Sequence, residues 1–399
     1  MRASVLSRIA VSKFAALALV ATMVMVVGCV VEVVDDDPPG PTGGSSMVDV
    51  RWYTSNQSSL TYNITTAAQL AGLAQLVNEG NSFSNRTVVL RNSISLLSYG
   101  PMNNSFNDGR GWIPIGTDGK PFSGIFDGGD HIISGLYINN NTRNFVGLFG
   151  DISGGVVKNL GIANGQVTGR ANNGGLVGRV TGAGSSITDC WFSGTVTGNA
   201  ESTGGLAGVL AGGGTISRSL SEAVVSGISL VGGLVGRLAD GGTAVNNSYA
   251  TGNVSGGRAV GGLVGETRGA SIVSNCYAIN NVVSTASYVG GLVGETWDGS
   301  ITNSAALNPN IGAVGAYGRA RGENSGAIVN TVAFIDMMFD DLPTAWNNEA
   351  RNGTDITADE IYDDPTIGNR FRESNGWTVV PGYLPGLFGE PVEMPAHLQ

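Results

Sequence analysis

Histidine and basic residues are scarce in this chain. Its 399 residues include two histidines, and 21 Lys+Arg stand against 31 Asp+Glu. Neither His131 nor His397 lies in a His-Glu-x-x-His pattern, which excludes that zinc site and leaves little for a Ser-His-Asp triad. Three of the basic residues and none of the acidic ones fall in residues 1–28, so the chain from residue 29 on carries a formal charge of −13. This charge argues against nucleic acid or an anionic membrane surface as a partner.

Long hydrophobic runs are also missing. The longest, residues 14–27, is too short to span a bilayer and follows Arg2, Arg8 and Lys13, as in the core of a signal peptide. The residues Val26-Val27-Gly28-Cys29 resemble a bacterial lipobox, which implies cleavage before Cys29 and acylation of that residue. The alternative is an ordinary secretory signal with an incidental cysteine. Residues 29–46 are acidic and then rich in Pro, Gly and Ser, which predicts a tether without packed structure.

Glycine, in contrast, is abundant, with 63 residues, and much of it lies in a repeat. Gly-Gly-Leu-Val-Gly, or a sequence one letter away, recurs at intervals of 28 to 30 residues, and a looser copy precedes the series at Gly147. The copies begin at Gly174, Gly204, Gly232, Gly261 and Gly290. A fixed period of this length predicts a solenoid.

Each repeat contains three short apolar stretches separated by turn residues, for example 231–236, 245–250 and 253–255. We therefore predict an all-β fold, a parallel β-helix with three-strand coils of about 29 residues. The leucine of each motif is expected to point inward and the residue after it outward, as strands alternate. Glycine is expected to supply positive φ at the corners.

The repeat resembles the GLUG motif of bacterial surface proteins, over roughly residues 62–385. Upstream, Trp112-Ile-Pro-Ile-Gly116 and Phe122-Ser-Gly-Ile-Phe-Asp-Gly128 resemble the segment that leads into such solenoids, and downstream Gly376-Trp377 and Leu384-Pro385 resemble their ending. The same motif lies outside the catalytic part of IgA-specific zinc metallopeptidases. Their catalytic motif is lacking here, so the resemblance implies an architecture and no peptidase activity.

The two flanks of the repeat region predict caps. Leu70, Leu73, Leu76 and Val77 share one face of a helix starting near Thr65–Thr66, which would cover the first coil. The predicted organisation is a signal peptide (1–28), a tether (29–46), an N-terminal cap with first coils (47–143), the repeat β-helix (144–330) and a C-terminal cap (331–399).

Two cysteines, Cys190 and Cys276, remain after residue 29. They fall in the same column of the repeat, three coils apart, which is about 14 Å at one strand spacing per coil and too far for a disulfide. Serine holds this column elsewhere, so we expect two buried free thiols. A metal or redox role is not expected, because no histidine or second cysteine lies in the pattern.

Carboxylates offer two weak signals for chemistry. Residues 126–131, Phe-Asp-Gly-Gly-Asp-His, could bind Ca²⁺ or transfer protons, or could simply form a tight turn at Asp127-Gly128-Gly129. The position after each motif reads Asp151, Arg179, Val209, Arg237, Glu266 and Glu295. There, Arg237 and Glu266 predict a cross-strand ion pair on the surface, with a ligand-facing strip as the alternative.

Aromatic residues form one candidate ligand surface. The column beside the Ser/Cys positions reads Trp191, Leu220, Tyr249, Tyr277 and Ala305. If Ser and Cys point inward, Tyr249 over Tyr277 would form an exposed stack suited to sugar rings or partner proteins, although stacked aromatics are also ordinary solenoid packing. Trp297 is a similar candidate in the loop at 295–299.

These observations favour a non-catalytic, lipid-anchored surface protein for adhesion or ligand binding, at the outer membrane or cell surface of a bacterium. Partners would be the membrane, through Cys29, and a glycan or a host or cell-surface protein, and no cofactor, metal or catalytic residue is predicted. The alternatives are a polysaccharide-active β-helix enzyme, a lyase or glycoside hydrolase, and a structural spacer of the envelope. The enzyme would need carboxylates on neighbouring coils around a groove.

Overall fold

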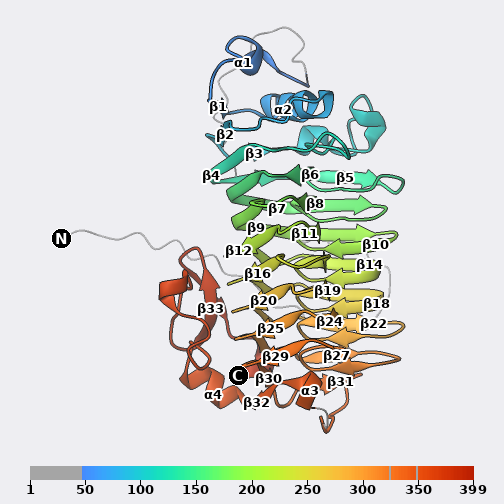
Figure 1. Ribbon diagram of the computed structural model, residues 1–399, viewed down its shortest axis with the longest axis vertical. Coiled ribbons are helices and arrows are strands. Elements are labelled where there is room, and N and C mark those ends of the chain that lie inside the picture. Colours follow the sequence, from blue (N-terminus) through green and yellow to red (C-terminus); the bar gives the residue numbers. More distant parts are fainter. Residues whose placement is uncertain (1–46, 323–324, 347–348) are drawn as a thin grey trace, which may run out of the picture. The chain divides into compact units, whose positions relative to one another are not determined.

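The computed structural model describes residues 47–322, 325–346 and 349–399 (Figure 1). The predicted signal peptide, Cys29 and the tether lie outside the described residues. None of the helices within the described ranges has the length and apolar character needed to cross a bilayer.

The N-terminal part holds two helices, α1 (Arg51–Thr54) and α2 (Ala67–Glu79). Thr66 caps α2 by accepting a hydrogen bond from the Gln69 N–H at 3.3 Å, and Gly80 ends the helix at φ 118°. The predicted face of Leu70, Leu73, Leu76 and Val77 is buried in the same hydrophobic core as the coils. The predicted amphipathic helix is therefore present with its predicted start.

Most of the remaining described residues form a parallel β-solenoid, as predicted. Six strands form one sheet, here called the motif sheet, and each of them begins within a Gly-Leu-Val-Gly repeat or its looser copy. Neighbouring strands pair in register, with Ala207 opposite Val177 and Val235. Its strands are β6 (Phe149–Ser153), β8 (Val177–Thr181), β11 (Ala207–Leu210), β15 (Val235–Leu238), β19 (Val264–Arg268) and β24 (Val293–Trp297).

The remaining faces of the coils join into one 26-stranded sheet among the described residues. Its strands up to residue 204 are β1 (Thr61–Ile64), β2 (Thr87–Leu90), β3 (Ile94–Ser95), β4 (Ile125–Ser134), β5 (Tyr137–Asn140), β7 (Val156–Gly169), β9 (Ser186–Gly198) and β10 (Glu201–Gly204). The next are β12 (Thr215–Ser217), β13 (Leu220–Ser221), β14 (Val224–Gly232), β16 (Ala244–Asn246), β17 (Tyr249–Ala250), β18 (Val254–Gly261), β20 (Ile272–Ser274), β21 (Tyr277–Ala278), β22 (Val282–Ser284) and β23 (Val289–Gly290). The last are β25 (Ser300–Thr302), β26 (Ala305–Ala306), β27 (Asn310–Gly312), β28 (Tyr317–Gly318), β29 (Ala327–Val329), β30 (Val332–Phe334), β31 (Met338–Phe339) and β32 (Thr354–Ile356).

In the coil of residues 231–255, two of the three predicted stretches are divided. The stretch 231–236 crosses from the end of β14 at Gly232 to the start of β15 at Val235, so it joins two different sheets. The stretch 245–250 is cut between β16 and β17, where Asn247 adopts φ 49°. The coil therefore has more corners than three uninterrupted strands would give.

The expected outward position of the residue after each motif leucine is wrong. The leucines are fully buried, and so are the residues that follow them: Phe149, Val177, Ala207, Val235, Val264 and Val293. Because the chain changes sheets at the leucine, strand alternation does not operate across this step, and two consecutive side chains enter the core. The motif thus contributes two core columns.

The expected role of the motif glycines in supplying positive φ is also wrong. No motif glycine is among the described positive-φ residues, and a Cβ on Gly232 would overlap the Val235 carbonyl oxygen, while one on Gly265 would overlap the backbone of Leu230. These glycines are needed for close backbone approach. Positive φ at the corner before the Ser/Cys column falls mostly on Asn and Asp, which tolerate it: Asn159, Asp189, Arg218, Asn247, Asn275, Asn303 and Asn330.

The Ser/Cys column forms a hydrogen-bonded ladder inside the solenoid. The Ser248 hydroxyl donates to the Asn246 carbonyl at 2.8 Å and accepts from the Ser219 N–H at 3.1 Å, so it joins neighbouring coils. Cys190 and Cys276 occupy the same column as buried free thiols, as predicted. Burial raises the pKa of both thiols to about 12, which keeps them protonated and unreactive at neutral pH.

The coils continue beyond residue 330, where the sequence analysis placed the start of a cap. Strands β30 and β32 extend the sheet, with Val332 paired to both Ala305 and Thr354, and α3 (Glu349–Asn352) lies just before β32. Residues 357–399, here called the C-terminal segment, contain α4 (Ala358–Asp363), β33 (Tyr383–Leu387) and β34 (Glu390–Glu393). This segment returns along the side of the solenoid, beside β16, β20 and β25 (Figure 1).

Candidate functional site

Tyr249 and Tyr277 stack as predicted, but they are not exposed. Their ring centroids lie 4.9 Å apart at an interplanar angle of 5°, and the two residues are 4% and 0% exposed. Trp377 of the C-terminal segment packs on both rings, and Phe371 packs edge-on against Tyr277 at 5.5 Å. The Tyr277 hydroxyl donates to the Pro385 carbonyl at 2.6 Å. The predicted exposed stack is therefore wrong, because a segment distant in sequence covers it.

Trp191, in the same column, is half-buried. It lies so close to Gly161 of the preceding coil that a Cβ there would overlap the indole ring. Trp191 thus fills the space left by a glycine, as a packing residue does. Of the four predicted ligand-surface residues, only Trp297 remains clearly accessible.

Trp297 ends β24 at the edge of the motif sheet, and 49% of it is exposed. It is the register partner of Arg268, which ends β19. These two residues line a hollow of about 190 Å³ together with Gly269 and Asp298. Gly269 and Asp298 both have positive φ, 57° and 58°, so each strand ends in a sharp turn around the hollow.

Two buried carboxylates lie in the same strands, two residues before Arg268 and Trp297. Glu266 and Glu295 are register partners, and they are 0% and 1% exposed. Because side chains at positions i and i+2 of a strand share a face, these carboxylates lie on the same side of the sheet as the hollow. The predicted pair of Arg237 and Glu266 does form, at 2.9 Å, but its carboxylate is buried rather than on the surface.

Three arginines compensate these two carboxylates. Glu266 contacts Arg237 Nε through Oε2 and Arg268 Nε through Oε1, both at 2.9 Å. Glu295 Oε1 accepts from Arg258 Nη2 at 2.7 Å. Arg258 and Arg268 do not occupy the repeat position that directly follows each motif. A comparison of that position between repeats therefore could not identify them as partners of Glu266 and Glu295.

Burial raises the pKa of Glu295 above its ordinary value, while the Arg258 charge and a hydrogen bond with Trp297 act in the opposite direction. The cluster of Arg258, Glu266, Arg268, Glu295 and Trp297 is called the Trp297 site below.

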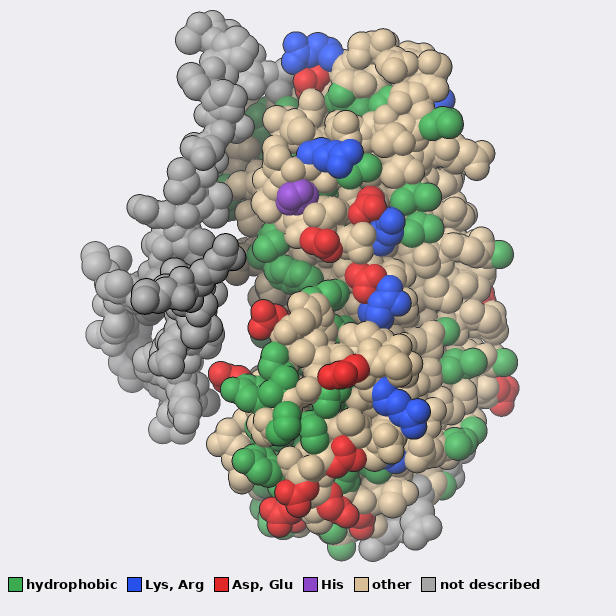
Figure 2. All heavy atoms as spheres, turned by 90° about the vertical axis from the view of Figure 1, so that its left-hand side faces the viewer, with side chains coloured by type: hydrophobic (Ala, Val, Ile, Leu, Met, Phe, Trp, Pro, Cys, Tyr) green, Lys and Arg blue, Asp and Glu red, His purple; other side chains and the backbone are tan. Residues whose placement is uncertain are grey.

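The other predicted polar positions make structural contacts. Residues 127–131 form a bulge in β4 in which Gly129 and Asp130 have φ near 60°, and Asp127 contacts Lys158 Nζ at 3.0 Å. This geometry agrees with the tight-turn interpretation. In the following coils, Arg218 contacts Asp189 at 2.6 Å. Figure 2 shows acidic and basic side chains next to one another on one lateral face of the protein.

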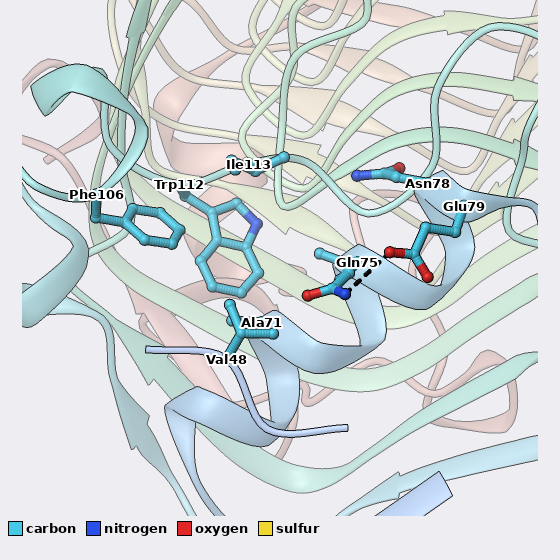
Figure 3. A pocket seen from close by; sticks show the side chains of 9 residues that line it. Val48, Ala71, Gln75, Asn78, Glu79, Phe106, Trp112 and Ile113 are labelled. Carbon is cyan, nitrogen blue, oxygen red and sulfur yellow. Dashed lines mark hydrogen bonds between the residues drawn. The ribbon is translucent and has the colours of Figure 1, made fainter. Parts of the chain in front are cut away.

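A second hollow, of about 280 Å³, lies beside α2, and the sequence analysis did not predict it. Its wall is mainly apolar, and Figure 3 shows the Trp112 ring between Phe106 and the helix, with the polar side chains of Gln75 and Glu79 farther along. Trp112 is 1% exposed, and its Nε1 donates to the Leu148 carbonyl at 3.2 Å. Within the described ranges, no three His, Cys, Asp or Glu side chains are grouped as a metal site.

Comparison with known proteins supports the repeat assignment. Residues 256–283 and 285–312 match the model of the GLUG motif, so the chain carries GLUG repeats. In structure, the chain is similar to a Bacteroides ovatus protein provisionally described as an immunoglobulin A1 protease, with a TM-score of 0.55 and 22% identity, over 83% of this chain and 93% of that one. At this identity the likeness establishes the fold.

Two sequence relatives match smaller parts of the chain. A protein of Evansella cellulosilytica, provisionally named a Gly-rich membrane protein, is 33% identical over 129 residues, 32% of this chain. Halomucin of Haloquadratum walsbyi is 37% identical over 124 residues, 30% of this chain. The matched regions span 14% and 1% of the lengths of these relatives.

Proposed function

We propose that this protein is a cell-envelope β-solenoid that is anchored through acylated Cys29 and binds a ligand at the Trp297 site without transforming it. Its location is supported by the lipobox-like sequence before Cys29 and by relatives named as a membrane protein and a halomucin. A rigid solenoid on a lipid anchor would present its lateral faces to partners.

The exposed indole of Trp297, beside a hollow, is the observation that carries this proposal. A half-exposed tryptophan beside a hollow offers an apolar face at a low entropic cost, and such faces stack on sugar rings and on partner side chains. The arginines around it supply directional donors. A glycan is therefore the ligand class that we favour.

A polysaccharide-active enzyme is the competing function, because Glu266 and Glu295 are two carboxylates on neighbouring coils. Both side chains are buried and paired with arginine, so neither reaches solvent, where a glycosidic bond would lie. This arrangement favours binding over catalysis.

A glycan array with the full chain in detergent tests the binding function, with reducing-sugar release measured in parallel on each bound polysaccharide. We expect Trp297→Ala to abolish binding and Trp297→Phe, which keeps an aromatic face, to retain part of it. Trp191→Ala serves as the matched control and should bind normally. Release of sugar ends that disappears in Glu295→Gln would replace the binding proposal with the enzyme.

The anchor needs a separate experiment. Labelled palmitate should enter the wild type and not Cys29→Ser when both are expressed in a bacterium that processes lipoproteins. Equal labelling of the two proteins would contradict anchoring at this residue.

A further inference from the structure

We infer that the ligand of the Trp297 site is a sugar that carries a carboxylate, such as a uronate or sialate residue of an acidic glycan. This inference rests on the proposed function and narrows its ligand class. It follows from the position, the charge and the unused donors of one arginine beside the indole.

Arg268 lies where a substituent of a stacked ring would be. It is the register partner of Trp297 on the adjacent strand, so the two backbones are about 4.8 Å apart. Its side chain is 48% exposed, and it lines the same hollow as the indole.

Most donors of Arg268 are unused within the described part of the chain. Its guanidinium has five N–H groups, and its recorded hydrogen bond runs from Nε to Glu266 Oε1 at 2.9 Å. That bond holds the plane of the group, while both Nη atoms remain for a ligand. An arginine fixed in this way presents the fork that binds a carboxylate through two parallel hydrogen bonds.

The accessible charged groups of the site are mainly basic. Glu266 and Glu295 are buried and already paired, whereas the guanidinium groups of Arg258 and Arg268 reach the surface, 44% and 48% exposed. Asp298, at the rim of the hollow, is the acidic group that a ligand would also meet, and its carboxylate suits the hydroxyl donors of a sugar. A ligand with one carboxylate and several hydroxyls satisfies both kinds of group.

With a neutral sugar, the Arg268 guanidinium would donate hydrogen bonds to uncharged oxygen atoms instead of a carboxylate. Charge-assisted hydrogen bonds are roughly twice as strong as neutral ones, so the carboxylate should determine the preference of the site, while stacking on Trp297 is common to both kinds of sugar. The preference should weaken as salt is added, because the arginine is partly exposed.

The test is calorimetric titration of the full chain in detergent with two matched ligand pairs. The pairs are tri-galacturonate with its carboxyl-reduced form, and sialyllactose with lactose. We expect the acidic member of at least one pair to bind at least tenfold more tightly than its neutral partner. Arg268→Gln should remove this difference, Arg268→Lys should keep only part of it, and Trp297→Ala should weaken both members.

Arg218→Gln is the matched control, since Arg218 is similarly exposed, at 40%, but pairs with Asp189 on another face. Unfolding midpoints of all variants show whether Arg268→Gln remains folded, and Arg268→Lys keeps the inference testable if it does not. Equal binding of acidic and neutral sugars that still depends on Trp297 would overturn this inference and leave the proposed function standing. Binding of no sugar from either pair, with glycan-array binding intact, would also overturn it.

Discussion

The Tyr249–Tyr277 column and the Trp297 site are both places where coils of the same repeat bring aromatic side chains to the outside of a sheet. The tyrosines are covered by Trp377, Phe371 and the backbone at Pro385, and they have become part of the core. Trp297 is half-exposed beside charged side chains. The difference comes from outside the repeat, since only the tyrosine column lies under the C-terminal segment.

The largest expected effect comes from uncovering the tyrosine column. Trp377→Ala removes a 3%-exposed side chain that packs on two stacked rings, so we expect a loss of about 3–5 kcal/mol in the free energy of unfolding, measured by urea denaturation. Tyr383→Ala in the same segment, at a 40%-exposed residue, should cost less than about 1 kcal/mol. Equal effects of the two substitutions would mean that the segment does not stabilise the column.

At the Trp297 site the corresponding sensitive residue is a charge. Glu266→Ala would leave Arg237 and Arg268 without their shared carboxylate. We expect a loss of about 2–3 kcal/mol, below the ~3–5 kcal/mol typical of fully buried pairs, because the two arginines are partly exposed. Asp189→Asn, which removes the charge of a partly exposed pair with Arg218 and keeps a residue that tolerates positive φ, should cost less than about 1 kcal/mol under the same conditions.

Beneath the tyrosines, the Ser/Cys ladder should give a smaller effect. Ser248→Ala removes a hydroxyl that both donates and accepts, at an expected cost of about 1–2 kcal/mol, and thermal unfolding would measure it. Cys276→Ser should stay within about 1 kcal/mol of the wild type, because serine already occupies this position in neighbouring coils. A loss for Cys276→Ser larger than that for Ser248→Ala would contradict the ladder.

The smallest effect on stability is expected at Trp297. Its ring is half-exposed, so Trp297→Ala should change the free energy of unfolding by no more than about 1 kcal/mol while it abolishes ligand binding. Denaturation and calorimetry on the same sample separate the two effects. A loss of stability close to that of Trp377→Ala would mean that Trp297 is a packing residue. It would contradict the distinction between a covered tyrosine column and an exposed Trp297 site.

The repeat spacing was sufficient to predict the solenoid, and Thr66 with the spaced leucines was sufficient to predict α2. Periodicity reports local structure that recurs in every coil, and both features are of that kind. It could not predict that Phe149 or Val264 points inward, since this depends on a change of sheet within the motif. Nor could it predict that Tyr249 is buried, since this depends on contacts with the C-terminal segment, which lies outside the repeat.

For the Trp297 site, the sequence identified Trp297, Glu266 and Glu295, but not the burial of the two carboxylates. The Glu266 carboxylate is held by Arg268, two residues farther along the strand, as well as by Arg237. Arg258 reaches Glu295 from β18, 37 residues earlier. Contacts of this kind depend on the spatial offset between neighbouring coils. An alignment of the repeats does not give this offset.

The return of the C-terminal segment has a consequence for the order of folding. The coil-to-coil hydrogen bonds of the Ser/Cys ladder join residues 28 or 29 positions apart, so each coil can form on the one before it through contacts that are short in sequence. The bonds from Tyr277 to Pro385 and from Trp377 to Asn247 join residues 108 and 130 positions apart. The tyrosine column is therefore closed by contacts far more distant in sequence than those that stack the coils, so we expect it to be covered later in folding than the coils form.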